Sequence, residues 1–153
     1  IFAMMKNGDH AVFQSDLYGG TFHAVINELP RYGMEYTMVD AAIPENFMKA
    51  IRPETRVIYI ETPSNPTLKI TDISAVSSIA KAHGITTIID NTFASPVNQN
   101  PIDLGIDIVT HSGTKYIGGH SDICCGVALA TRSLIQKIRE SAIHFGGSSA
   151  CSS

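Results

Sequence analysis

The sequence lacks the features that mark several large classes of protein. Its 11 Lys and Arg residues are scattered and outnumbered by 14 Asp and Glu residues, so it has no basic block that would neutralise a nucleic-acid backbone. No apolar run approaches the roughly 20 residues that span a bilayer. The apolar stretch at residues 1–5 is too short and wrongly flanked for a signal peptide. We therefore expect neither a nucleic-acid nor a membrane partner, and a cytoplasmic location.

Cysteine and the common ligand-binding motifs are also scarce. The three cysteines, Cys124, Cys125 and Cys151, suggest neither a disulfide framework nor a zinc site by count or spacing. We interpret Cys124 and Cys125 as small strand residues that point to opposite faces. The six histidines show no ligand spacing, so no metal site is expected. The glycine-rich dinucleotide fingerprint, the Walker A loop and the His-Glu-x-x-His motif are absent, which argues against a generic doubly wound nucleotide binder.

What the chain does contain is an alternation of strand-like and helix-like segments. With 153 residues, 44% of them hydrophobic, and a net charge of −3, it has the size of one domain and can bury a core. The patterns predict strands at 10–14, 35–39, 56–61, 85–90, 106–110 and 127–130, and helices near 21–29, at 44–50, between Asp72 and Gly84, and at 134–143. This order is typical of an open α/β sheet with helices on both faces.

Polar and aromatic residues follow the predicted strands. Tyr18 comes after the first strand, Asn65 after the third, Asp90 ends the fourth, and residues 112–115 follow the fifth. In open α/β sheets, ligands bind beyond the carboxyl ends of the strands. The sequence therefore predicts a ligand site at this edge.

Lys115 stands among hydroxyls and glycines directly after an apolar strand. It is either an ordinary surface lysine or, if the turn shelters it, an amine that can form a Schiff base with an aldehyde and move protons. Ser112 and Thr114 flank Gly113 and suit a phosphate group, although ordinary hydroxyl capping is the alternative. The Ser-x-x-Lys pattern of serine acyl enzymes also fits, but its partner motifs are absent.

Asp90 and Tyr18 also have two interpretations each. Asp90, followed by Asn91, is a common turn former, but a carboxylate there could also keep a pyridine nitrogen protonated. Tyr18 lies beside two glycines and either packs in the core or stacks on a flat ligand. Together the amine, the anion cradle and the carboxylate are the three groups that pyridoxal phosphate requires.

Four motifs resemble one family. They are Asp-Leu-Tyr-Gly-Gly-Thr at 16–21, Glu-Thr-Pro-Ser-Asn-Pro at 61–66, Asp-Asn-Thr-Phe at 90–93 and Ser-Gly-Thr-Lys-Tyr-Ile-Gly-Gly-His-Ser-Asp at 112–122. In this order they look like the cysteine and methionine metabolism enzymes that depend on pyridoxal phosphate. That group includes cystathionine γ-synthase, γ-lyase and β-lyase, methionine γ-lyase and the O-acylhomoserine sulfhydrylases. The resemblance implies the large domain of an aspartate-aminotransferase-like (fold type I) protein, with a mainly parallel mixed sheet.

The resemblance also implies a role for each matching residue at the ring of the cofactor. Lys115 would carry the cofactor as a Schiff base, and Asp90 would pair with its pyridine nitrogen. Tyr18 would stack over the ring and act as an acid or base when the sulfur leaves. Asn65 would lie near the phenolic oxygen, with Thr92 below the ring.

The cofactor's phosphate would be held by Ser112 and Thr114. Between them, family members commonly have Ala where this chain has Gly113, a change that should leave the turn usable. The implied reaction is elimination or replacement at Cγ or Cβ of sulfur amino acids or homoserine esters. Methionine γ-lyases typically have Cys where this chain has Gly20, which favours cystathionine-type or sulfhydrylase chemistry.

The extent of the resemblance predicts that the chain is part of a longer protein. Residues 1–148 would be the central part of the cofactor-binding large domain, residues 149–153 do not match the family, and an N-terminal segment and a C-terminal domain would be absent. The family's upstream Ser-Gly and Tyr-x-Arg segments and its downstream substrate-binding arginine are not in this sequence. We expect the parent protein to be a homo-oligomer, a dimer or tetramer. An inactive fragment or a cofactor-binding module is the non-enzymatic alternative.

Overall fold

The computed structural model describes residues 1–146, and the expectation for 149–153 lies outside this part. The strands are β1 (His10–Gln14), β2 (Glu35–Val39), β3 (Thr55–Glu61), β4 (Thr86–Asp90), β5 (Ile108–Ser112) and β6 (Gly126–Ala130). The helices are α1 (Gly19–His23), α2 (Leu29–Arg31), α3 (Glu45–Ala50), α4 (Ile73–Ala82), α5 (Ser95–Asn98) and α6 (Arg132–His144). Short 3₁₀ segments are η1 (Phe2–Met4) and η3 (Pro101–Leu104), and π-helical segments are η2 (Ala24–Glu28) and η4 (Gly113–Ile117).

All six strands belong to one sheet with the order β2-β1-β3-β4-β5-β6. The first five are parallel, and β6 is antiparallel to β5. This is the mainly parallel mixed sheet that was expected. β5 begins two residues later than predicted because the Asp107 carboxylate accepts the backbone N–H and the hydroxyl of Thr87, at 2.8 and 2.9 Å. The regular ladder between β4 and β5 therefore starts at Ile88 and Ile108.

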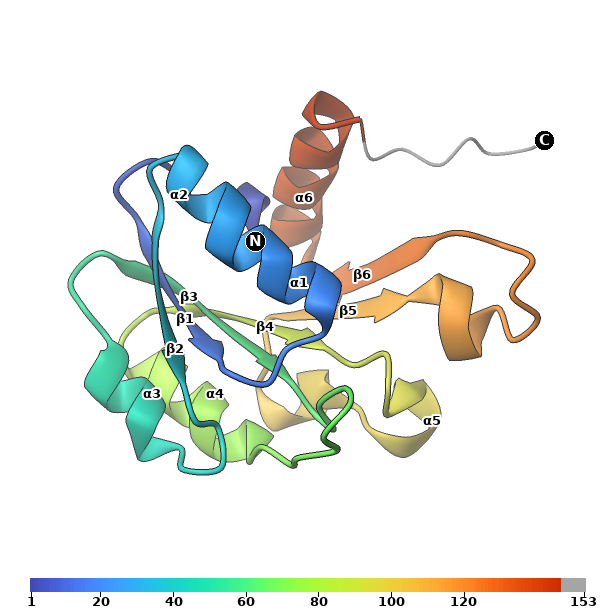
Figure 1. Ribbon diagram of the computed structural model, residues 1–153, viewed down its shortest axis with the longest axis horizontal. Coiled ribbons are helices and arrows are strands. Elements are labelled where there is room, and N and C mark those ends of the chain that lie inside the picture. The colour runs from blue at the N-terminus through green and yellow to red at the C-terminus, as the bar shows by residue number, and fades with distance from the viewer. Residues whose placement is uncertain (147–153) are drawn as a thin grey trace.

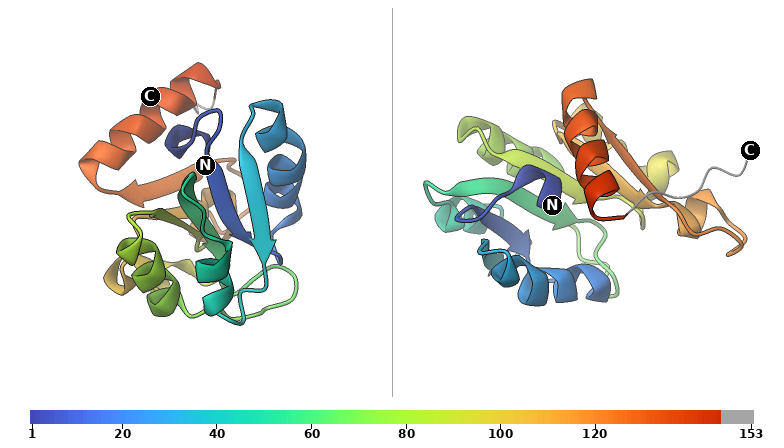
Figure 2. Two further views of the ribbon diagram at one scale, coloured as in Figure 1. Left: turned by 90° about the vertical axis from the view of Figure 1, so that its left-hand side faces the viewer. Right: turned by 90° about the horizontal axis from the view of Figure 1, so that it is seen from above.

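Helices cover both faces of the sheet, as predicted (Figures 1 and 2). On one face α1, η2, α2 and α6 lie over the sheet, and on the other α3, α4 and α5 do so. Successive strand residues point to opposite sides, so Tyr59 joins the first core and Ile58 the second. Val25 and Leu29 fill the first core from the helices, whereas Phe47 belongs to the second. Burial on both faces explains why the strands lack a clean apolar–polar alternation.

The first helical segment is longer than predicted, since it continues past Pro30 to Arg31. The Leu29 N–H donates to the Ala24 carbonyl, an i→i+5 bond, and the following Pro30 has no N–H to donate. The wider π turn thus comes directly before the residue that cannot extend the α-helical pattern. Gly33 follows the helix in the turn and has a left-handed φ of 67°.

Helix α4 has the predicted signals at both ends. The Asp72 side chain accepts the N–H of Ala75 at 2.9 Å, and Gly84 follows the helix with a φ of 65°. A correction concerns Cys124 and Cys125, because β6 begins only at Gly126 and neither cysteine is part of a strand. Cys124 is exposed and Cys125 is half-buried.

Candidate functional site

The carboxyl ends of β1, β3, β4 and β5 meet at one edge of the sheet, beside the projecting η4 segment (Figure 2). A cavity of about 440 Å³ lies there, within the size range of small-molecule sites. Its lining includes all seven residues singled out from the sequence: Tyr18, Asn65, Asp90, Thr92, Ser112, Thr114 and Lys115. It also includes Glu61, Phe93, Tyr116, Gly119 and Ser121. The structure thus brings the candidates together, whereas their individual roles stay predictions.

Asp90 sits at the end of β4 and is half-buried. Its Oδ1 accepts the N–H of Thr92 at 2.9 Å, so Asp90 does form the turn that one interpretation proposed. Within residues 1–146, its Oδ2 receives no hydrogen bond, which leaves this oxygen for a ligand. The Thr92 hydroxyl in turn accepts the N–H of Ser112 at 2.7 Å and ties the β4 loop to the end of β5. Asp90 is therefore both a turn former and an available carboxylate.

The segment with Lys115 follows β5 without a break. Lys115 is exposed, so this part of the chain does not shelter the amine as the sequence-based interpretation required. Its backbone, with φ −91° and ψ −120°, departs from the helical geometry of its neighbours in η4. The Thr114 hydroxyl accepts the N–H of Cys125 at 3.1 Å and donates to the Cys125 carbonyl at 3.4 Å. The turn thus rests on the segment that precedes β6.

Aromatic rings line the cavity. Tyr18 is 53% exposed, so packing in the core is ruled out for its ring. The ring lies against Gly20, where a Cβ would come within 2.8 Å of Tyr18 Cε1. Phe93 and Tyr116 form an edge-to-face pair with centroids 6.3 Å apart. Rings of this kind can stack on a flat ligand.

Glu61 is the functional candidate that sequence reasoning missed. It ends β3 as Asp90 ends β4, and the two residues are neighbours in the parallel register. Its Oε2 accepts the N–H of Tyr18 and its Oε1 accepts the N–H of Asn65, both at 2.9 Å. An acidic residue at the end of an apolar strand was a visible signal, but the structure alone shows which N–H groups it meets.

Burial dominates the electrostatics at this edge. It raises the pKa of Glu61, against the two backbone N–H donors, and the nearby Asp90 raises it further. Burial also raises the pKa of the Tyr59 hydroxyl, again with a contribution from Asp90. The pKa of His111 is lowered by burial, and its Nδ1 has no hydrogen-bond partner among the described residues. The site therefore holds two adjacent carboxylates beside a buried phenol.

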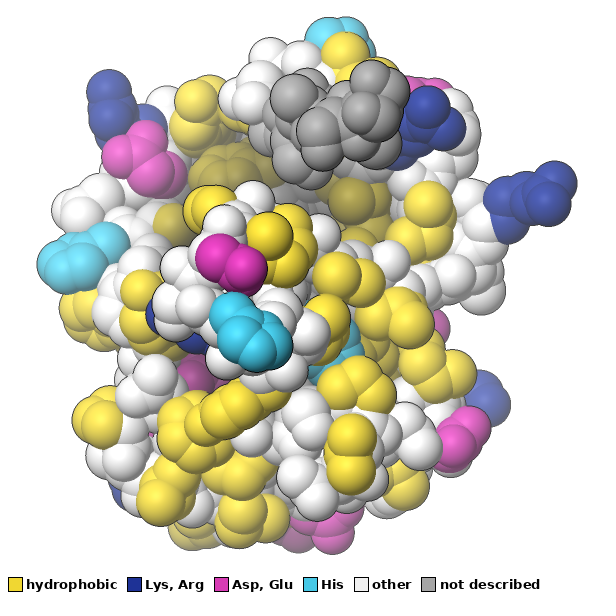
Figure 3. All heavy atoms as spheres, turned by 90° about the vertical axis from the view of Figure 1, so that its right-hand side faces the viewer, with side chains coloured by type: hydrophobic (Ala, Val, Ile, Leu, Met, Phe, Trp, Pro, Cys, Tyr) yellow, Lys and Arg dark blue, Asp and Glu magenta, His cyan; other side chains and the backbone are white. Residues whose placement is uncertain are grey.

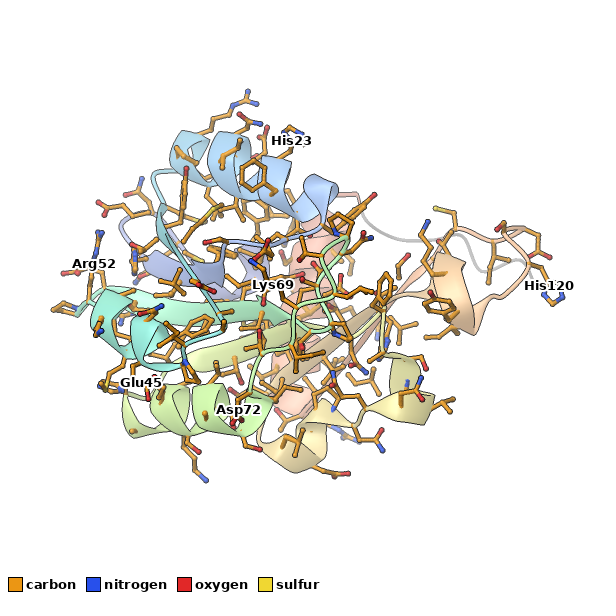
Figure 4. All side chains as sticks on the ribbon, turned by 60° about the horizontal axis from the view of Figure 1, so that its bottom comes forward. His23, Glu45, Arg52, Lys69, Asp72 and His120 are labelled. Carbon is orange, nitrogen blue, oxygen red and sulfur yellow. The ribbon has the colours of Figure 1, made fainter. Side chains whose placement is uncertain are left out.

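Hydrophobic side chains spread over the end of the molecule near the cavity (Figure 3). Val97 is 91% exposed, and Tyr116, Ile117 and Ile123 are also exposed. Exposed apolar surface of this kind commonly marks an interaction site. Arg52 lies at the opposite end of the molecule from His120, which is at the tip of the loop after η4 (Figure 4).

Membrane spans and metal clusters are both absent from residues 1–146. No helix in this range is both long and apolar enough to cross a bilayer. No three His, Cys, Asp or Glu side chains of this range gather as metal ligands.

Comparisons with known proteins agree with the geometry. A family model described as "Cys/Met metabolism PLP-dependent enzyme" matches residues 1–152. Cystathionine β-lyase MetC of Bacillus subtilis (strain 168) is 51% identical over 127 residues, which are 83% of this chain and 33% of that protein. A probable cystathionine γ-synthase of Herpetosiphon aurantiacus is 46% identical over 140 residues, 91% of this chain and 44% of that protein.

A solved structure gives the same result. The crystal structure of cystathionine γ-lyase from Lactobacillus plantarum complexed with L-serine is 46% identical and superposes with a TM-score of 0.90. The match covers 94% of this chain and 38% of that one. This likeness confirms the predicted fold class. The chain spans less than half the length of each of these relatives.

Proposed function

Since this chain belongs to the Cys/Met metabolism PLP-dependent enzyme family, we propose that its parent protein catalyses elimination or replacement at Cγ or Cβ of sulfur amino acids or homoserine esters. Cystathionine-type chemistry is the reaction we favour. The observation that carries the proposal is one cavity lined by Lys115, Asp90 and the hydroxyls of Ser112 and Thr114. These groups come from the ends of two neighbouring strands and the turn that follows.

The donor set of the cavity fits pyridoxal phosphate. Lys115 supplies an amine for the aldehyde, and the open Oδ2 of Asp90 supplies a carboxylate for the pyridine nitrogen. Ser112 and Thr114 supply hydroxyls for the phosphate. Tyr18 presents an exposed ring for stacking. When bound, the cofactor provides the sink for the electrons of a broken bond at the substrate's Cα.

The chain's own residues would then perform the proton transfers and the positioning. The Lys115 Nζ would take the proton from the substrate's Cα. The carboxylate of Asp90 would favour a proton on the pyridine nitrogen of the cofactor. The Tyr18 hydroxyl exchanges a proton with the departing sulfur. Asn65 and Thr92 would help to hold the cofactor ring.

The exposure of Lys115 bears on how the site is completed. An exposed amine is solvated, and a productive site excludes water. We propose that further chain of the parent protein and a second copy cover this end, so that the active form is a homo-oligomer, a dimer or tetramer. The exposed apolar side chains around the cavity support this proposal. The proposed location is cytoplasmic.

The direct test is chemical. Full-length protein is reduced with borohydride, digested and mapped by mass spectrometry, and cofactor mass is expected on Lys115. Lys115→Ala should abolish the visible absorbance of lysine-bound cofactor, whereas Lys81→Ala, at an exposed lysine on α4, should keep it. Cofactor mass on another lysine would overturn the assignment. Assays with cystathionine, methionine and O-acetylhomoserine then separate the reaction types.

A further inference from the structure

The Glu61 carboxylate joins two loops that are far apart in the sequence. One oxygen accepts the N–H of Tyr18 in the loop after β1, and the other accepts the N–H of Asn65 in the loop after β3. Both distances are 2.9 Å, typical of charge-assisted hydrogen bonds. A single side chain thus sets the distance between the backbones of two residues that line the cavity.

The backbone of Glu61 is itself held firmly. Its N–H donates to Oε1 of Gln14, and its carbonyl accepts from Nε2 of Gln14, both at 2.8 Å. The amide of Gln14 thereby continues the pairing of β1 and β3 beyond the last residues of their ladder. Because Gln14 is buried, these bonds are protected from water. The carboxylate is therefore presented from a rigid position.

Only a carboxylate can make this bridge with a side chain of this length. It has two equivalent acceptor oxygens, whereas the amide of Gln has one acceptor and one donor group. Both hydrogen bonds are partly buried, so an N–H that lost its Glu61 acceptor would be incompletely solvated and would cost free energy. Another link between these loops is the ion pair of Lys69 with Asp16 at 2.7 Å. Its lysine side chain is 54% exposed, and such surface pairs contribute little.

We propose that Glu61 is a positioning residue for the cofactor site: it holds the Tyr18 and Asn65 loops at the spacing that both residues would need to contact a bound cofactor. The inference rests on the proposed function. It gives Glu61 no direct contact with the substrate. Its effect on the reaction comes through Tyr18 and Asn65 alone.

The experiment compares the Glu61→Gln and Glu61→Ala variants of the full-length protein with the unsubstituted full-length protein. Glu54→Gln is the matched control, because Glu54 is an exposed carboxylate just before the other end of β3. Amide hydrogen exchange measures the protection of the Tyr18 and Asn65 N–H groups by Glu61, and it does not require an active enzyme. In Glu61→Ala the amides of Tyr18 and Asn65 should exchange about 10- to 100-fold faster, the range for loss of a hydrogen bond to a charged group. The Thr92 and Ser112 amides, which have other acceptors, should not change.

The bound cofactor supplies the second readout. Displaced loops should weaken its visible circular dichroism and lower kcat by up to about 100-fold, with a smaller change in KM. Glu61→Gln keeps one acceptor oxygen, so its exchange rates, dichroism and kcat should lie between those of the unsubstituted protein and those of Glu61→Ala. It also provides a test if the Ala variant misfolds. Unchanged exchange at Tyr18 and Asn65 in both variants would overturn the inference, as would altered exchange with unchanged dichroism and kcat. If the full-length protein without any substitution carries no lysine-bound cofactor, the proposed function is overturned before any variant is compared.

Discussion

Gly113 and Cys125 are in such close contact that a Cβ on Gly113 would lie 2.5 Å from Cys125 Sγ. The Cys125 carbonyl also accepts the N–H of Thr114 at 3.3 Å. The turn that carries Lys115 is therefore packed directly on Cys125. Family members that resemble this chain commonly have Ala at this position, and in this chain an added methyl group would first require the Cys125 side chain to move.

This contact predicts strong coupling between the two positions. Gly113→Ala should destabilise the protein by about 1–3 kcal/mol, the usual cost of overpacking. Adding Cys125→Ala should recover much of that loss, because it removes the sulfur that the new methyl group meets. The free energy of unfolding of both single variants and the double variant, measured in urea, gives the coupling. Cys124→Ala, at the exposed neighbour, is the control, and simple additivity would contradict the prediction.

The contact between Tyr18 and Gly20 leads to a second prediction. In Gly20→Ala the new Cβ would lie 2.8 Å from the ring, so the ring must shift and kcat/KM for cystathionine should fall by up to about 100-fold. Gly19→Ala is a matched control, since a Cβ at Gly19 would point into open space. Steady-state kinetics with cystathionine and methionine would measure both effects. Equal losses in the two variants would mean that helix α1, and not the ring, is responsible.

Asp90→Asn separates the two interpretations of that residue. The Asn side-chain oxygen can still accept the N–H of Thr92, so the turn and the unfolding midpoint should be retained. Loss of the negative charge should lower kcat by about 10²- to 10³-fold, the range for removal of one electrostatic group in an active site. Measurements of kcat, cofactor content and unfolding midpoint test this together. Normal kcat would leave Asp90 as a turn former only.

His10 predicts a pH dependence of stability at the opposite edge of the sheet. Its ring bonds the hydroxyls of Thr55 and Thr37 at 2.8 and 2.9 Å. Burial, and next the charge of Arg52, lower the pKa of His10 from its ordinary 6.5. As the pH falls below 6.5, the unfolded chain takes up this proton before the folded one does, so stability is lost. This contribution of His10 to stability is fully present above that pH.

The free energy of unfolding between pH 8 and pH 5 measures this effect. His10→Gln should reduce the slope, whereas His23→Gln, at an exposed histidine on α1 (Figure 4), should leave it as in the parent. His111, whose pKa is also lowered by burial, should account for part of the slope that is left in His10→Gln. An unchanged slope in His10→Gln would refute the assignment to His10.

Local signals predicted the elements well where they had a short-range physical cause. The Asp72 cap and Gly84 defined α4, and the apolar runs located every strand to within two residues. The signals failed where a tertiary contact prevailed. Asp107 delayed the start of β5, and the π turn carried the first helix past Pro30. Segments α5, η3 and η4 have no periodicity long enough to detect.

The candidate site was likewise predictable only in part. Residue order alone placed Tyr18, Asn65, Asp90 and Lys115 after strands, and because parallel strands share one carboxyl edge, their meeting there was foreseeable. The bridge by Glu61 and the packing of Cys125 on Gly113 join segments that are separated along the chain. Strand register and side-chain direction decide such contacts, and these emerge only when the whole sheet has assembled. The sequence by itself thus determined which chemical groups the protein has, whereas the packed fold decided their geometry.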